Sequence, residues 1–166
     1  MKFPLNISKY HIFALLSIIY ASFIFYLSSL NDPTILTSEI TNFQFIYSLI
    51  GFFEEQDVEV AVDFLLFSYE HFDKIVHMIL YFGFGILLHL TFSNSDNKTL
   101  KHYAPFFAIL IGIFYGITDE VHQSFVPGRS ANTLDLFANG IGLALAQAIF
   151  WIIVLKNVYY NKKSGE

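Results

Sequence analysis

Four long apolar runs limit what this chain can fold into. They cover residues 11–30, 75–92, 103–121 and 134–155. A helix needs about 20 predominantly apolar residues to cross the hydrocarbon core of a bilayer. The third run reaches residue 121 only if the acidic residues at its end, Asp119 and Glu120, are housed inside protein. We therefore predict an all-α integral membrane protein with four transmembrane helices, in one domain over residues 1–166.

The composition excludes several other classes of protein. Only 14% of the residues are charged and 55% are hydrophobic, whereas soluble domains carry about 25% charged residues. The chain has no cysteine, which excludes disulfides and thiolate metal sites. A net charge of -5 disfavours a nucleic-acid partner, which would require a basic patch. The first run lacks a signal-peptide cleavage pattern, so we expect it to remain as a span.

Lysine and arginine residues predict the orientation in the membrane, because cytoplasmic loops are enriched in them. The connection between the first two spans, residues 31–72, has eight acidic residues and no Lys or Arg. Seven lysines flank the other ends of the spans: Lys2, Lys9, Lys98, Lys101, Lys156, Lys162 and Lys163. Both termini are therefore predicted to be cytoplasmic, and segment 31–72 is predicted to lie outside.

The outer segment shows helical periodicity in its first half. Apolar residues recur there at steps of three and four, which predicts an amphipathic helix along the membrane surface: Leu36, Ile40, Phe43, Tyr47 and Ile50. The second half, residues 58–69, alternates like a strand but also suits a helix. A helix is favoured, because an isolated strand would leave its edges unpaired.

Polar residues gather at the predicted outer ends of three spans. The second span begins on the outer side, the third ends there, and the fourth begins there again. Spacings of three or four residues put the polar members of each helix on one face. The candidate ligand-binding residues are Asp73, Lys74, His77, Asp119, Glu120, His122, Gln123, Arg129, Asp135 and Asn139. We predict that they form a polar pocket in the outer leaflet.

Several of these residues also have a purely structural interpretation. Asp73 could cap its helix, and Asn132 followed by Asp135 resembles a capping box. Lys74 and Arg129 could extend to lipid headgroups. Asp119 and Glu120 are harder to explain, because a helix C-terminus disfavours anions. Lys74 and Arg129 are their expected partners, and an inert ion-pair network is the alternative to a functional site.

Two stretches resemble the signature blocks of the VanZ-like membrane protein family. They are DKIVHMILYFGFG, from Asp73, and GITDEVHQSFVPGRSANTLDLFANGIG, from Gly116. The resemblance implies a multi-pass protein of the bacterial cytoplasmic membrane, with the ten candidate residues as its site. It also implies a link to low-level resistance to teicoplanin, a glycopeptide antibiotic with a fatty-acyl tail. It implies no settled biochemical mechanism.

Three functions compete at this stage. The favoured one is binding of an amphiphilic envelope lipid or lipoglycopeptide, with the lipid bilayer as the other partner. The alternative is an intramembrane hydrolase or transferase, with His122, Glu120, Asp119 and His77 as catalytic candidates. No cofactor is predicted, although imidazole and carboxylate groups could hold a divalent metal. The third is a scaffold whose acidic outer segment recruits a partner.

Overall fold

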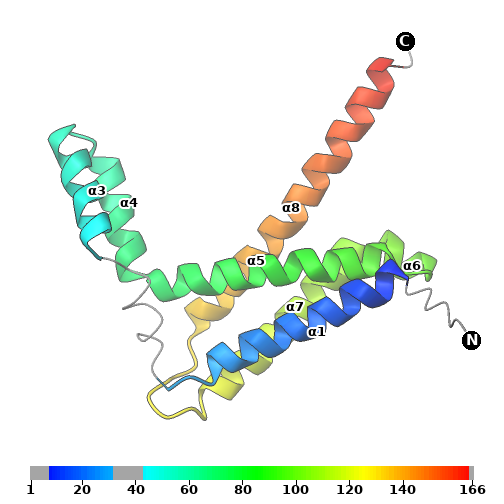
Figure 1. Ribbon diagram of the computed structural model, residues 1–166, viewed down its shortest axis with the longest axis horizontal. Coiled ribbons are helices and arrows are strands. Elements are labelled where there is room, and N and C mark those ends of the chain that lie inside the picture. Colours follow the sequence, from blue (N-terminus) through cyan, green and yellow to red (C-terminus); the bar gives the residue numbers. More distant parts are fainter. Residues whose placement is uncertain (1–7, 32–42, 165–166) are drawn as a thin grey trace, which may run out of the picture.

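The computed structural model describes residues 8–31 and 43–164, and these residues form helices without any strand. The helices are α1 (Lys9–Ser28), α3 (Phe43–Glu55), α4 (Glu59–Glu70), α5 (Phe72–Ser93), α6 (Lys98–His102), α7 (Ala104–Gln123) and α8 (Thr133–Ser164) (Figure 1). Four are long and apolar enough to cross a membrane: α1, α5, α7 and Thr133–Asn157 of α8. The predicted number of spans and the all-α fold are confirmed.

The helix ends extend beyond the predicted runs at the positions where polar residues occur. α5 begins at Phe72, so Asp73 and Lys74 lie in its first turn. α7 continues to Gln123, and its acidic residues Asp119 and Glu120 are only 4% and 6% exposed. The condition for a full-length third span, burial of the acidic pair, is therefore met.

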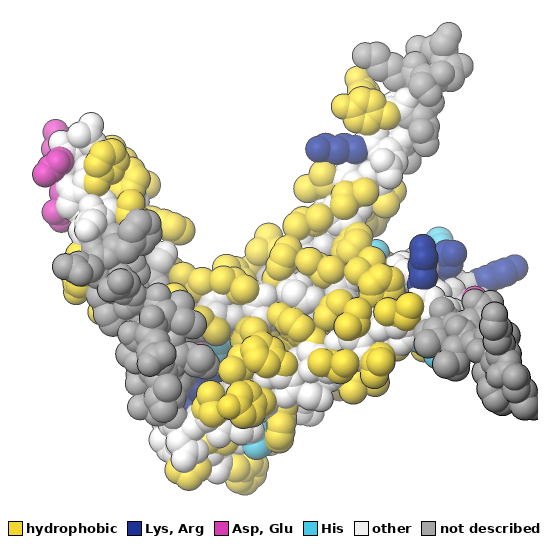
Figure 2. Space-filling model, viewed as in Figure 1, with side chains coloured by type: hydrophobic (Ala, Val, Ile, Leu, Met, Phe, Trp, Pro, Cys, Tyr) yellow, Lys and Arg dark blue, Asp and Glu magenta, His cyan; other side chains and the backbone are white. Residues whose placement is uncertain are grey.

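The helix α5 is the centre of the bundle and contacts α1, α7 and α8 (Figure 1). It runs opposite to α1 and α7, so the α5–α7 connection with Lys98 and Lys101 lies at the end where α1 begins. Figure 2 shows hydrophobic side chains over most of the visible bundle surface, with basic side chains gathered at this end. The arrangement agrees with a common side for the lysines, while the orientation itself remains a prediction.

Small residues allow α8 to approach α5 and α7 closely. A Cβ added to Gly142 would meet the carbonyl oxygen of Met78 and, at 2.8 Å, the amide nitrogen of Phe82. The fully buried Leu143 fills the space beside two other glycines, Gly85 and Gly112. Such close packing of helix backbones is typical of membrane proteins, where no hydrophobic effect holds helices together.

Polar contacts also join the helices away from the helix ends that carry the predicted site residues. His89 Nδ1 donates to Gln147 Oε1 at 2.7 Å, and Gln147 Nε2 donates to the carbonyl of Gly85 at 3.2 Å. Ser17 and Thr91 share a hydrogen bond of 3.1 Å between α1 and α5. Each of these groups has a partner, so they are explained as interhelical contacts.

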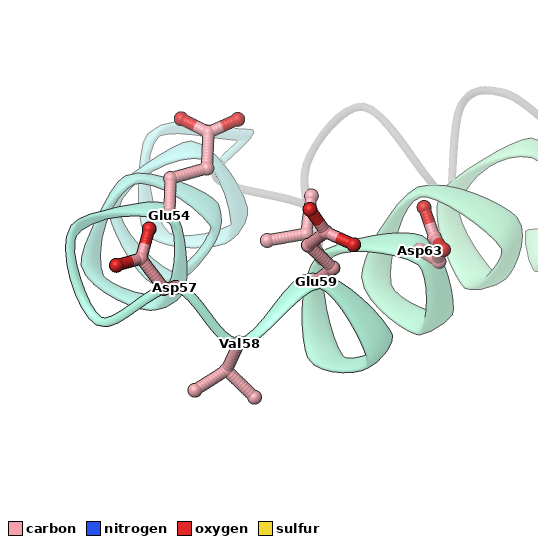
Figure 3. Close-up of a pocket in the computed structure, with 6 residues that line it drawn as sticks. Glu54, Asp57, Val58, Glu59 and Asp63 are labelled. Atoms are coloured by element: carbon pink, nitrogen blue, oxygen red, sulfur yellow. The ribbon is translucent and has the colours of Figure 1, made fainter.

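The described part of the outer segment forms a hairpin of α3 and α4 that projects away from the bundle at the start of α5 (Figure 1). The helical interpretation of residues 58–69 is confirmed by α4. Leu36 and Ile40 of the amphipathic stripe lie outside the described residues, whereas Ile50 is buried. The α3–α4 turn carries an acidic pocket of about 340 Å³, with the carboxylates of Glu54 and Glu59 among its lining (Figure 3).

Candidate functional site

A polar cluster lies where the mouths of α5, α7 and α8 meet. We define it as the eight predicted residues on these helices that are linked by the contacts below, plus Tyr81 and the loop residue Arg129. The cluster is Asp73, Lys74, His77, Tyr81, Asp119, Glu120, Gln123, Arg129, Asp135 and Asn139. Nine of the ten predicted site residues are therefore brought together, and His122 is the exception.

Lys74 forms ion pairs with two carboxylates and ties α5 to α8. Its Nζ lies 2.9 Å from Asp135 Oδ1 and also pairs with the neighbouring Asp73. Asp135 is only 7% exposed, so this contact neutralises a buried charge. The expectation that Lys74 pairs with Asp119 and Glu120 is wrong, because its ammonium group pairs with Asp135 and Asp73 instead.

His77 lies one turn further into the bundle and bonds to α8. Its Nδ1 is 3.0 Å from Oδ1 of Asn139, a side chain with no exposed surface. The Oδ1 atom can only accept, so Nδ1 carries the proton of the neutral ring and the lone pair lies on Nε2. This bond fixes both the tautomer and the direction of the imidazole.

Asp119 is held by neutral groups through one of its two oxygens. Gln123 Nε2 donates to Asp119 Oδ2 at 3.2 Å, and the Tyr81 hydroxyl donates to the same oxygen at 3.4 Å. Gln123 in turn accepts from Arg129 Nη2 at 2.8 Å. Arg129 was expected to pair directly with the carboxylates, but it contacts Asp119 only through Gln123.

Glu120 reaches across to the start of α8. Its Oε2 accepts from the backbone N–H of Asn132 at 2.9 Å, while Asn132 Oδ1 accepts from the N–H of Leu134 at 3.0 Å. In a capping box, the acid that closes the cap belongs to the same helix. Here the predicted acid, Asp135, is engaged by Lys74, and Glu120 of α7 supplies the carboxylate instead.

His122 points away from the cluster, towards α1. Its Nε2 lies 3.0 Å from Ser29 Oγ, and its ring stacks on Phe25 with centroids 4.4 Å apart. A step of three residues along a helix leaves side chains about 60° apart around the axis. That offset turns His122 towards α1 while Asp119 faces α5, so His122 is removed from the catalytic candidates.

Four buried polar atoms of the cluster have no hydrogen-bond partner among the described residues: Asp119 Oδ1, Glu120 Oε1, Asn139 Nδ2 and Asp135 Oδ1, of which the last is in an ion pair with Lys74. One ligand atom from each of His77, Asp119 and Glu120 lies within 4.8 Å of the other two. The cluster holds four carboxylates and only two permanent cations, Lys74 and Arg129, so two negative charges remain when all are ionised. Unpaired buried charge is costly, so Asp119 and Glu120 are unusual residues for a membrane-spanning helix.

Sequence reasoning missed two members of this arrangement, Tyr81 and the backbone of Asn132. Tyr81 follows His77 by four residues, so continuing the polar face of α5 by one more turn would have found it. No sequence signal marks the Asn132 N–H, because its partner Glu120 lies on another helix.

An apolar groove of about 330 Å³ lies along α8 next to Ile113 of α7, and the cluster residue Asn139 is part of its lining. Its lining is Ile113, Leu136, Phe137, Asn139, Gly140, Ile141 and Ala144. Asn139 belongs to both, since it lines the groove and bonds to His77. Phe137 and Ile141 are exposed on the surface where lipid would lie.

Comparisons with known proteins agree with the membrane fold. A family model described as VanZ/LLP1 matches residues 11–154, a range that overlaps all four spans and includes the whole cluster. The chain is also similar to the uncharacterized protein C11E3.10 of Schizosaccharomyces pombe, at 28% identity over 95 residues. This match covers 57% of the chain and 51% of the relative, so the chain spans about half the length of that protein. No solved structure matches.

Proposed function

The chain belongs to the VanZ/LLP1 family of membrane proteins, and from this premise we propose that it binds an amphiphile at the mouths of α5, α7 and α8. The polar head lies at the polar cluster, and the hydrocarbon tail lies in the α7–α8 groove. The ligand is an envelope lipid or a lipoglycopeptide. The bacterial cytoplasmic membrane is the proposed location, with the cluster on its outer side.

One observation carries this proposal: the groove and the cluster meet at Asn139. An amphiphile needs an apolar channel that is open to lipid and continuous with polar groups that can bind its head. The unpartnered atoms of Asp119, Glu120 and Asn139 offer both acceptors and a donor to such a head. Arg129 donates to Gln123 through Nη2, and its other N–H groups, which have no partner among the described residues, add a site for phosphate or carboxylate.

Filling the groove should weaken binding of the tail. Gly140 lines the groove, and nothing lies within 4 Å of a Cβ added there. We expect Gly140→Leu to weaken teicoplanin binding to purified protein in detergent by about tenfold, equivalent to about 1.4 kcal/mol. Titration calorimetry measures this, with an isoprenyl diphosphate-linked glycan and tail-less vancomycin as the other ligands.

The matched control is Gly51→Leu in α3. A Cβ at Gly51 also meets open space, and Gly51 is not one of the residues that line the groove. Its affinity should equal that of the wild type. Equal affinity of vancomycin and teicoplanin, or no saturable binding of any of the three ligands, would refute the proposed function.

The resistance role is tested in cells. A glycopeptide-sensitive host that expresses this protein should be protected against teicoplanin and not against vancomycin, because only teicoplanin has a tail for the groove. Glu120→Ala should abolish protection, since it removes a buried oxygen available to the head and the cap of α8. His122→Ala should retain it, because His122 faces α1. Minimum inhibitory concentrations at matched membrane levels decide the outcome, and the absence of protection by the wild type would refute this role.

A further inference from the structure

We propose that His77, Asp119 and Glu120 bind a divalent transition-metal ion, which receives the oxygen atoms of the amphiphile's head. Only the identity of the group that binds the ion, the amphiphile's head, rests on the proposed function. The metal site itself is inferred from the side chains of the cluster. The three residues bring one imidazole and two carboxylates to within 4.8 Å. Zinc ligands of these types lie about 2.0–2.2 Å from the ion. Ligand atoms around a tetrahedral ion at these distances lie about 3.4 Å apart, so an approach of no more than about 1.4 Å between the ligand atoms would close the site.

Each of the three side chains is already held through one of its polar atoms. His77 is held at Nδ1 by Asn139, Asp119 at Oδ2 by Gln123, and Glu120 at Oε2 by the backbone of residue 132. What remains for a ligand is the lone pair on His77 Nε2 and the unpartnered oxygens Asp119 Oδ1 and Glu120 Oε1. Metal ligands are typically oriented by outer contacts of this kind.

The charges agree with a dication. Asp119 and Glu120 are at least nine-tenths buried, and no cation forms an ion pair with either of them among the described residues. Lys74 is engaged by Asp73 and Asp135, and Arg129 by Gln123. A single divalent ion would cancel the two negative charges left in the cluster. Two buried carboxylates in this position are otherwise hard to reconcile with a membrane segment.

The ligand set also indicates what the ion would do. Imidazole with carboxylates suits Zn²⁺, Mn²⁺ or Fe²⁺ better than Mg²⁺ or Ca²⁺, which prefer oxygen ligands alone. Three protein ligands leave at least one coordination position open, as in zinc sites that bind a reactant, whereas structural zinc sites are closed by four. In this proposal, the open position receives a phosphate, carboxylate or hydroxyl oxygen of the head, while the tail lies in the groove that has the cluster residue Asn139 in its lining.

The test uses full-length protein purified in detergent without chelators. Inductively coupled plasma mass spectrometry should find about one divalent transition metal per chain, since one site is proposed. After chelation, Zn²⁺ should rebind and raise the thermal unfolding midpoint, and Co²⁺ should give a visible spectrum typical of mixed nitrogen and oxygen ligands. The isosteric variant Glu120→Gln and the variant His77→Ala should each lose at least about tenfold in Zn²⁺ affinity, because each removes a ligand.

Two further variants separate a ligand from a neighbouring residue. His122→Ala is the matched control for His77→Ala, because both remove an imidazole from the same region and His122 bonds to Ser29. It should retain the metal. Asn139→Ala removes the group that orients His77 and should lower Zn²⁺ affinity about 10–100-fold without abolishing the cobalt spectrum, the signature of a positioning residue.

The metal site and the proposed function can fail independently. Gly140→Leu should keep the metal while it loses amphiphile binding, because it fills the groove and leaves the ligands unchanged. Wild-type protein that binds neither Zn²⁺, Mn²⁺ nor Co²⁺, or unchanged affinity in both His77→Ala and Glu120→Gln, would overturn the metal site and leave amphiphile binding standing. Metal retention without any amphiphile binding would overturn the proposed function alone.

Discussion

Replacing Gly142 by alanine should destabilise the bundle by about 1–3 kcal/mol or more, because the new methyl group has no room. A Cβ at this position would meet the carbonyl oxygen of Met78 and the amide nitrogen of Phe82, both of them backbone atoms of α5. A flexible side chain could rotate away, whereas backbone atoms can yield only if α8 moves away from α5. The midpoint of thermal unfolding in detergent, followed by circular dichroism, should fall accordingly.

Gly140→Ala is the matched control for this change. It lies two residues earlier on the same helix, and an added Cβ has nothing within 4 Å. Alanine is favoured over glycine in a helix by about 0.5–1 kcal/mol, so this variant should be slightly stabilised. If the two variants unfold at the same temperature, the close contact between α5 and α8 at Gly142 is wrong.

A displaced α8 would also pull Asp135 and Asn139 away from α5. Both side chains bond to α5, through Lys74 and His77 respectively. The glycine contact therefore positions the polar cluster as well as stabilising the fold. Gly142→Ala should consequently reduce amphiphile binding, although Gly142 is not a member of the cluster.

The spans could be predicted from the sequence because a helix that crosses a bilayer must be apolar along most of its length. Length and hydropathy alone located all four helices, and the alternation of spans brought their polar mouths to one end. The errors concern the ends of the runs. α5 and α7 continue into polar residues that the apolar runs did not include. These residues are tolerated inside the helices because neighbouring helices bury them.

Contacts within the cluster were less predictable, because the rotation of each helix about its axis depends on its neighbours. Two errors follow from helix rotation, and a third follows from the conformation of the loop that carries Arg129. His122 turned to α1, Arg129 reached Gln123 instead of a carboxylate, and Lys74 paired with Asp135. Each alternative was equally compatible with the spacing along the chain, and only packing decides between them.

Lys74→Met should be the most damaging single change in the cluster, at about 3–5 kcal/mol of folding stability. It removes the cation from Asp135, which is 7% exposed and lies 2.9 Å from the ammonium group. The carboxylate would remain buried beside a cluster that already carries excess negative charge. Thermal unfolding in detergent and the level of protein in membranes both measure the loss.

The second change in the pair decides whether this loss comes from the stranded charge. In Lys74→Met with Asp135→Leu, the buried carboxylate that lost its cation is removed as well, and only the more exposed Asp73 is left without its partner, so most of the stability should return. Lys101→Met, at the opposite end of the bundle on an exposed residue, should change stability by less than about 0.5 kcal/mol. A double variant as unstable as the single one would show that Lys74 acts through its packing or through Asp73, and that the link between α5 and α8 is not an ion pair. The double variant could also recover stability and lose amphiphile binding. That result would separate two roles of this pair: the fold would need only a neutral contact, while binding of the amphiphile's polar head would need the charges.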